Sequence, residues 1–172
     1  MMKPTAFKPT ALVVMGVSGC GKSSAAAAVA EALGWQLLEG DAFHPAENVA
    51  KMRQGTPLND DDRQGWLAGL AAQLAQAGEA HPRVLTCSAL KKKYRDQLRA
   101  AQPRLGFVFL DLDYATALAR VQSRAGHFFS PELVANQFQT LESPVGEGDV
   151  LRVDATASLA QITAQVQEWL RS

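Results

Sequence analysis

The chain has 172 residues, a length that favours one domain with a buried core over two smaller domains. Lysine plus arginine and aspartate plus glutamate number 17 each, so the overall charge favours neither nucleic acid nor an anionic membrane as a partner. No apolar run approaches the roughly 20 residues of a membrane span, and residues 1–10 form a prolyl tail without the apolar core of a signal peptide. The two cysteines lack metal-ligand spacing and indicate reduced thiols. We therefore expect a cytoplasmic protein that acts on a small molecule.

The first predicted strand, about residues 11–15, leads into the segment from Gly16 to Ser23, which fits the pattern G-x-x-x-x-G-K-[ST]. Glycines there let backbone N–H groups converge on phosphate oxygens, and the positive end of the following helix adds to the attraction. Lys22 would neutralise the outer phosphates of a triphosphate, and the Ser23 hydroxyl would coordinate Mg²⁺. A chance match is on the order of 1% in a chain of this length, so we favour a nucleotide-binding loop over a simple connecting turn. The predicted nucleotide-binding residues of the loop are Gly16, Val17, Ser18, Gly19, Cys20, Gly21, Lys22, Ser23 and Ser24.

An alanine-rich helix is predicted over residues 22–33, and Gly34 supplies its stop. A short strand at about residues 35–38 comes next and is followed by two acids, Glu39 and Asp41. In open α/β sheets, ligands bind at the carboxyl ends of the strands. These two acids are therefore expected beside the phosphate-binding loop.

Three consecutive aspartates, Asp60–Asp62, follow a loop at residues 55–59 and precede a helix predicted from about residue 63 to residue 77. Acids at that place stabilise the positive end of a helix, and we expect at least one of the three to act as a cap. Asp111 and Asp113 follow an apolar run, where Asp111 could pass for a Walker B acid. We interpret both as loop and helix-cap acids.

Five short apolar strands alternate with helices along the chain, which predicts one α/β domain over residues 1–172 with a mainly parallel, five-stranded sheet covered on both faces. A polar and aromatic segment at about residues 124–143 interrupts this alternation, and we interpret it as a lid. The remaining strands are expected at about residues 83–88, 105–110 and 150–153, and the remaining helices at about residues 45–54, from 91 onward, 114–123, 131–141 and 158–170.

Several motifs occur in a fixed order and carry a family resemblance. In chain order they are the phosphate-binding loop, Gly40-Asp41-x-x-His44-Pro45, Pro57-Leu58-Asn59-Asp60-Asp61-Asp62-Arg63, Cys87-Ser88-Ala89-Leu90-Lys91-Lys92-x-Tyr94-Arg95 and Gly126-His127-Phe128-Phe129. With them the chain resembles the gluconokinase family, whose fold is like that of shikimate and nucleoside-monophosphate kinases. The resemblance implies a P-loop kinase that uses ATP and Mg²⁺ to phosphorylate D-gluconate at its C6 hydroxyl, giving 6-phosphogluconate. It also implies a homodimer.

The resemblance singles out Asp41 as the residue that contacts the acceptor hydroxyl, with a turn-forming aspartate as the alternative. Glu39 stands where some relatives carry aspartate, and either Glu39 or Asp41 is available for a water-mediated contact with Mg²⁺. Arg124 is expected to stabilise the charge of the moving phosphoryl group, and Arg120 to bind the nucleotide. Arginines on an ordinary surface helix are the alternative for these two.

Gluconate carries a carboxylate and five hydroxyls, so its site needs a cationic clamp and several hydrogen-bonding groups. The candidate cations are Arg53, Lys91 and Arg95. A solvated helix face is the alternative for the run Lys91-Lys92-Lys93, above all for Lys92 or Lys93. For His44 a structural role in a first helical turn remains open. The other candidate substrate contacts are His44, Asp60, Ser88 and His127.

Two other functions compete with this interpretation. Shikimate or nucleotide kinases share the predicted fold, but the His44-Pro45 pair and the loop at residues 57–63 argue against both. A regulatory GTPase would use a D-x-x-G element, which Asp62 and Gly65 match. That pattern is short, and an N-K-x-D element for reading guanine is missing from the sequence.

Overall fold

The structure, a computed structural model, describes residues 8–17, 19–123 and 131–171. Its centre is a single sheet of five strands in the order β2-β3-β1-β4-β5, and every ladder between these strands is parallel. The predicted α/β class and the five-stranded parallel sheet are thereby confirmed. The strands are β1 (Ala11–Met15), β2 (Gln36–Glu39), β3 (Arg83–Thr86), β4 (Leu105–Asp111) and β5 (Val150–Asp154).

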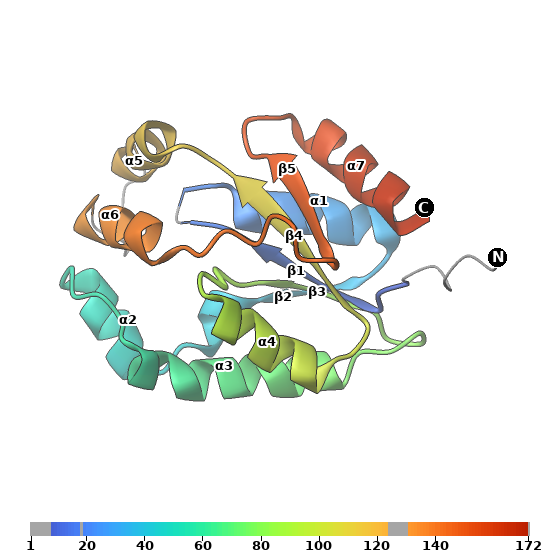
Figure 1. The fold of residues 1–172 in the computed structure, drawn as a ribbon, viewed down its shortest axis with the longest axis horizontal. Helices are drawn as coiled ribbons and strands as arrows, with labels where there is room; N and C mark the ends of the chain where they lie inside the picture. The colour runs from blue at the N-terminus through green and yellow to red at the C-terminus, as the bar shows by residue number, and fades with distance from the viewer. Residues whose placement is uncertain (1–7, 18, 124–130, 172) are drawn as a thin grey trace.

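Helices cover both faces of the sheet. Helices α1 and α7 pack together on one face, and α3 and α4 pack together on the other, while α2, α5 and α6 lie beyond the end to which the strands point (Figure 1). None of the helices in the described ranges combines the length and apolar character needed to cross a bilayer. The helices are α1 (Lys22–Leu33), α2 (Ala46–Arg53), α3 (Asp60–Ala75), α4 (Lys92–Ala101), α5 (Tyr114–Gln122), α6 (Pro131–Thr140) and α7 (Leu159–Arg171).

The central strand β1 is apolar throughout because each of its faces contributes to a different half of the core. Leu12 and Val14 belong to a buried cluster shared with α1 and α7, whereas Val13 and Met15 belong to a cluster shared with α3 and α4. Successive side chains of a strand point to opposite faces, so a strand buried on both sides loses the usual polar alternation. This burial fixes the carboxyl end of β1, from which the phosphate-binding loop begins.

Helix α3 begins three residues earlier than the sequence predicts, at Asp60 instead of residue 63. The cap is Asn59, whose side-chain oxygen accepts a hydrogen bond from the backbone N–H of Asp62 at 2.8 Å. Asp62 returns the bond by accepting from the backbone N–H of Asn59 at 3.0 Å, which completes a capping box. The predicted start was wrong because the N-cap is the amide side chain of Asn59, but Asp62 completes the capping box, so one of the three aspartates does act at this helix end as expected.

The two acids after the apolar run of β4 have different positions. Asp113 caps α5, as predicted, by accepting a hydrogen bond from the backbone N–H of Thr116 at 2.8 Å. Asp111 is the last residue of β4 and not a loop residue, and its carboxylate pairs with Arg152 of β5 at 3.0 Å. The Asp111 carboxylate is therefore engaged in an ion pair with a side chain of the neighbouring strand.

Both cysteines are free and buried, in agreement with the expected reduced thiols. Burial raises the pKa of the Cys87 thiol to about 12 and also raises the pKa of Cys20. Since the thiolate is the reactive form, these groups behave as apolar packing residues at neutral pH.

Candidate active site

The phosphate-binding loop connects β1 to α1. Gly21 lies just before α1 in the left-handed region, at φ 90°, where a side chain would be strained. The Lys22 ammonium donates hydrogen bonds to the carbonyl oxygens of Gly16 at 3.0 Å and Val17 at 3.1 Å, so it lies across the loop. The first turn of α1, which the structure describes in full, contains no acidic residue. The positive helix end and the ammonium are thus directed at the same place, as an anionic ligand requires.

A hydroxyl and a carboxylate adjoin each other beside this loop. Ser23 Oγ donates to Glu39 Oε2 at 3.1 Å, and Thr86 Oγ1 donates to the same carboxylate oxygen at 2.8 Å. Glu39 and Thr86 are the last residues of β2 and β3, so the ends of two paired strands position these groups. Of the two acids predicted near Mg²⁺, Glu39 is the one that contacts Ser23.

These oxygen donors fit magnesium. Mg²⁺ usually takes one or two protein oxygens and completes its shell with water and substrate phosphates, and Ser23 with Glu39 provides such a partial set. Within the described ranges, no group of three or more histidine, cysteine or acidic side chains could hold a metal alone. The chemistry of the site therefore suits a metal that arrives with a nucleotide.

Gly40 allows the chain to turn sharply after β2. A Cβ at this position would lie 1.9 Å from the Thr86 carbonyl oxygen, so no larger residue fits without moving backbone. The Gly40 N–H donates to Thr86 Oγ1 at 2.9 Å, and the Gly40 carbonyl accepts from the Trp66 indole N–H at 2.8 Å. The 3₁₀ turn that begins here, Gly40–Phe43, is held from both sides and fixes the backbone of Asp41.

Asp41 lies in this turn and His44 directly follows it, and their side chains are near each other although the imidazole is buried and the carboxylate is exposed. His44 Nε2 lies 3.8 Å from Asp41 Oδ1, and the Asp41 side chain is 58% exposed. The imidazole stacks on the Trp66 ring with centroids 4.0 Å apart. The Asn48 amide nitrogen lies 3.2 Å from His44 Nδ1; this nitrogen can only donate, so we assign Nδ1 of a neutral ring as the acceptor and place the proton on Nε2, toward Asp41.

Burial lowers the pKa of His44 to about 4, although the nearby Asp41 carboxylate opposes the shift. The imidazole is therefore neutral at neutral pH. It can donate one hydrogen bond into the pocket but does not add a positive charge there.

A pocket opens between the phosphate-binding loop, the turn after β2, α3 and α6. It brings together seven of the predicted site residues: Gly19, Gly21, Lys22, Ser23, Asp41, His44 and Ser88. The pocket also contains residues that were not predicted as site residues: Met52, Leu58, Arg63, Trp66, Leu133, Asn136 and Gln137. A cationic loop and an exposed carboxylate thus share one cavity.

Arg63 is a functional candidate that the sequence analysis missed. Its side chain is on the first turns of α3, it is 8% exposed, and its guanidinium donates to the Tyr94 hydroxyl at 3.0 Å. Trp66 is three residues further along the same helix, so both side chains face the pocket. The three-residue spacing of Arg63 and Trp66 was a usable signal, once the helix start at Asp60 was known.

Two of the predicted substrate contacts pair with each other outside the pocket. Asp60 accepts a hydrogen bond from Lys91 at 3.2 Å, and it also contacts Lys93 and the Tyr94 hydroxyl. Hydrogen bonds hold the pKa of Asp60 below its usual range; the bond from Lys93 has the largest effect, followed by those from Tyr94 and Lys91. Arg53 is exposed at the last residue of α2 and does not line the pocket.

A residue that clamps the substrate has to reach the pocket, and Arg95 does not line it. Its side chain is 0% exposed, and its guanidinium is bound to the carbonyl oxygens of Ala89 and Glu142 and to the Glu147 carboxylate. Its donors are directed into the protein and not into the pocket. We therefore withdraw Arg95 as a direct contact of the substrate, because burial and pairing keep it from any ligand.

Arg120 lies against the phosphate-binding loop, as a nucleotide contact must. Its guanidinium donates to the Gly19 carbonyl oxygen at 3.2 Å. Arg120 and Ser24 line a second hollow with Ala155 and Ala157, next to the main pocket. Three predicted site residues, Ser18, Arg124 and His127, lie outside the described residues, as does the 124–130 part of the predicted lid.

A parallel sheet in the order 2-3-1-4-5, with a phosphate-binding loop after the central strand and a carboxylate across the pocket, defines a P-loop kinase of small molecules. Comparisons with known proteins narrow the class. A family described as "AAA domain" matches residues 12–144.

Among curated proteins, the chain is similar to the thermoresistant gluconokinase of Escherichia coli (strain K12), with 44% identity covering 92% of each protein. It is 48% identical to the gluconokinase of Gluconobacter oxydans (strain 621H), over 86% of this chain and 83% of that protein. A solved structure of a gluconokinase from Sinorhizobium meliloti 1021 superimposes with a TM-score of 0.85 at 45% identity, covering 97% of this chain and 94% of the other. The chain belongs to the gluconokinase family, and the resemblance seen in its motifs is confirmed.

Proposed function

We propose that this protein is a gluconokinase that transfers the γ-phosphoryl group of ATP to the C6 hydroxyl of D-gluconate, releasing 6-phospho-D-gluconate and ADP. The proposal rests on family membership together with one observation: the Asp41 carboxylate and the Lys22 ammonium line the same pocket. The Asp41 carboxylate can orient an alcohol that accepts the phosphoryl group, and the Lys22 ammonium can bind the phosphates of the donor.

On the donor side, the phosphates of ATP lie in the loop from Gly16 to Ser24. The Lys22 ammonium exchanges its bonds to loop carbonyl oxygens for bonds to the outer phosphates, and Arg120 holds the nucleotide from the side of α5. Ser23, and Glu39 through water, would hold Mg²⁺, which would supply charge neutralisation at the phosphate oxygens.

On the acceptor side, Asp41 aligns the C6 hydroxyl with the γ-phosphorus and takes its proton as the new bond forms. Phosphoryl transfer passes through a loose transition state, so alignment of the alcohol matters more than early removal of its proton. His44 Nε2 lies 3.8 Å from Asp41 Oδ1. The imidazole N–H is therefore placed to act as a second donor, which orients the Asp41 carboxylate or an adjacent substrate hydroxyl.

At the far end of gluconate, we place the carboxylate against Arg63. This arginine has a rigid fork of donors, and only one of its hydrogen bonds, to the neutral Tyr94 hydroxyl, is described. Ser88, Asn136 and Gln137 supply polar atoms for the remaining hydroxyls. Lys91, Arg53 and Asp60 are retained only as peripheral contacts, because they do not line the pocket.

Arg124 and His127 stay in the proposal on the strength of the sequence alone. Arg124 would stabilise the charge on the transferring group, and His127 would contact the substrate. We also propose that the lid of residues 124–143 closes over the nucleotide and limits hydrolysis, since Leu133, Asn136 and Gln137 of α6 already form one wall. The resemblance further supports a homodimer, and the proposal that the protein is cytoplasmic rests on the sequence alone.

A coupled assay of ADP release tests the proposal directly. The purified protein is given Mg·ATP with gluconate, other sugar acids, shikimate, nucleoside monophosphates or water alone. We expect ADP release with gluconate and only background release in the other samples. Release with shikimate or a nucleotide would reassign the substrate, and equal release in water would indicate an NTPase.

A further inference from the structure

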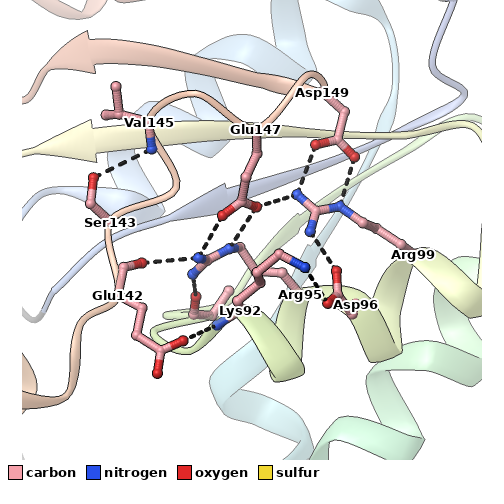
Figure 2. Close-up of polar contacts among 10 residues, drawn as sticks. Lys92, Arg95, Asp96, Arg99, Glu142, Ser143, Val145, Glu147 and Asp149 are labelled. Carbon is pink, nitrogen blue, oxygen red and sulfur yellow. Dashed lines mark hydrogen bonds and ion pairs between the residues drawn. The ribbon is translucent and has the colours of Figure 1, made fainter.

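The buried Arg95 of α4 makes polar contacts with groups from other segments of the chain (Figure 2). Its Nη1 donates to the Ala89 carbonyl oxygen at 2.7 Å, and its Nη2 donates to the Glu142 carbonyl oxygen at 2.9 Å. Ala89 belongs to the loop after β3, and Glu142 follows the end of α6. One guanidinium therefore holds two segments that are distant in the sequence.

The first of these segments has an unusual backbone. Ala89 has φ 47°, a left-handed conformation that disfavours any residue with a side chain, and among the described residues it is the one non-glycine with positive φ. The preceding residue, Ser88, lines the pocket. A carbonyl held by a buried guanidinium keeps this strained loop in one conformation, and with it the position of Ser88.

The second segment continues from α6. The Glu142 N–H donates to the Leu90 carbonyl oxygen at 2.7 Å, and the Glu142 carboxylate accepts from the Lys92 N–H at 2.9 Å at the start of α4. The end of α6 is thus bound both to the loop after β3 and to α4. Since Asn136 and Gln137 of α6 line the pocket, the position of this wall also depends on the Arg95 connection.

Glu147 keeps the buried guanidinium in place. It accepts from Arg95 Nε at 3.1 Å and from Nη2 at 2.8 Å, a bidentate arrangement that fixes the plane of the side chain. Burial favours the neutral acid, but hydrogen bonds from Arg95 and Arg99 outweigh it and lower the pKa of Glu147 below its usual value. The carboxylate is therefore charged at neutral pH, and the buried cation is compensated.

We propose that Arg95 is a positioning residue for the acceptor site: by holding Ala89 and Glu142 together, it sets the spacing between the Ser88 wall and the α6 wall. It does not touch substrate or nucleotide. The inference rests on the proposed function, because it assigns those walls to gluconate. The Lys22 and Arg120 contacts to the phosphate-binding loop do not involve this network, so ATP binding is expected to be independent of it.

The same helix provides a matched control, Arg99. Arg99 also pairs with Glu147, at 2.5 Å, and with Asp149, at 2.7 Å, but its described bonds reach neither Ala89 nor Glu142. Arg95→Lys and Arg99→Lys both keep the charge and both lose part of an ion-pair network (Figure 2). They differ in whether the two walls stay connected.

Steady-state kinetics of the two variants test the proposal. We expect Arg95→Lys to raise the KM for gluconate about tenfold while the KM for ATP stays within about twofold, and Arg99→Lys to leave both within about twofold. Equal effects of the two variants on gluconate, an equal rise in both KM values of Arg95→Lys, or a folded Arg95→Lys enzyme with an unchanged KM for gluconate would each overturn the proposal.

A measurement without substrate separates this proposal from the assignment of gluconate. Backbone hydrogen exchange of the free protein should become faster in Arg95→Lys at residues 87–92 and 137–147 together, and change less in Arg99→Lys. Faster exchange with no gluconate activity in the wild type would refute the substrate but keep the connection. Unchanged exchange in these segments would refute the connection itself.

If Arg95→Lys does not fold, Glu142→Ala replaces it. Glu142 is exposed, and the substitution removes the carboxylate that binds the Lys92 N–H without disturbing the buried guanidinium. A rise of about threefold in the KM for gluconate, with the KM for ATP unchanged, is expected because the end of α6 loses its side-chain link to α4, the helix that carries Arg95. No rise in a folded Glu142→Ala protein would count against the proposal.

Discussion

The donor half of the pocket is made mainly by one continuous stretch of chain, to which Glu39 and Arg120 are added from elsewhere, whereas the acceptor half is assembled entirely from separate segments. In the donor half, the loop from Gly16 to Ser23 contributes mainly backbone groups and one ammonium. In the acceptor half, Asp41 and His44 come from the turn after β2, Arg63 from α3 and Ser88 from the loop after β3. The first depends on local backbone geometry, and the second depends on tertiary packing.

Hydrogen bonds make this difference concrete. The acceptor half is connected through buried bonds such as Trp66 to Gly40, at 2.8 Å, and Arg63 to Tyr94, at 3.0 Å. These bonds also hold α3 against the sheet and against α4. A change in the donor half should therefore affect chemistry with little effect on folding, while a change in the acceptor half should affect both.

The largest effect is expected in the donor half. Lys22→Ala removes the charge that compensates the outer phosphates, and Ser23→Ala removes a ligand of the metal. We expect each to lower kcat by about 10³-fold or more, because charge stabilisation dominates phosphoryl transfer. Thermal unfolding of both variants should stay close to that of the wild type. Activity within a few-fold of the wild type, still dependent on Mg·ATP, would refute the assigned loop.

In the acceptor half, Asp41→Asn should lower kcat by about 10² to 10⁴-fold, the usual contribution of a general base. The asparagine keeps the size and one acceptor but removes the charge and the proton acceptor. ATP affinity, measured by calorimetry, should be nearly unchanged because the loop is intact. Near-normal kcat would refute the role of Asp41, and loss of ATP binding instead would move Asp41 to the metal.

The sequence predicted the donor half well because its signal is local. The motif determines both the loop and the start of α1 at Lys22, and the end of α1 at Gly34, in the left-handed region at φ 71°, was also predicted. The alternation of short apolar runs with helices was enough for the parallel sheet.

The acceptor half was predicted only in part because its residues are defined by distant partners. Arg63 was missed because its orientation depends on Tyr94, 31 residues later. Arg95 was assigned to the substrate because a basic helix start resembles a clamp, and only its pairing with Glu147, 52 residues later, shows that it is internal. Asp41 and His44 line the pocket, and their proposed roles rest on the resemblance because periodicity does not indicate them.

Arg63 tests the difference between the two halves, because it lines the pocket and also holds α3 against α4 through Tyr94. Arg63→Lys keeps the charge but loses the fork that can hold a carboxylate with two bonds. We expect the KM for gluconate to rise about 10 to 100-fold, with a destabilisation of about 1 kcal/mol from the lost bond to Tyr94. Tyr94→Phe is the control, because it removes that bond but leaves the guanidinium. If both variants have the same KM, Arg63 does not clamp the substrate.

The smallest expected effect is a pH dependence of the folding stability, which arises from the protonation of His44. The folded pKa, about 4, is below the ordinary 6.5, so between these values the unfolded chain binds more protons and stability rises with pH. Protonation of this group is expected to cost about 1 to 3 kcal/mol on going from pH 6.5 to pH 4, allowing for partial solvent screening. Asp41 and Arg63 are the charged groups that act on the ring, in opposite directions.

Urea unfolding of the wild type and of His44→Gln, at pH values from 7 to 4, isolates this contribution. Glutamine cannot be protonated, so the difference in the free energy of unfolding between the two proteins should shrink as pH falls, even if losing the stacking on Trp66 lowers the stability of the variant at pH 7. The other titrating groups are common to both proteins and cancel in that difference. A difference that stays constant over this range would mean that His44 is not buried in its neutral form. The acceptor half would then lack the coupling between folding and chemistry that distinguishes it from the phosphate-binding loop.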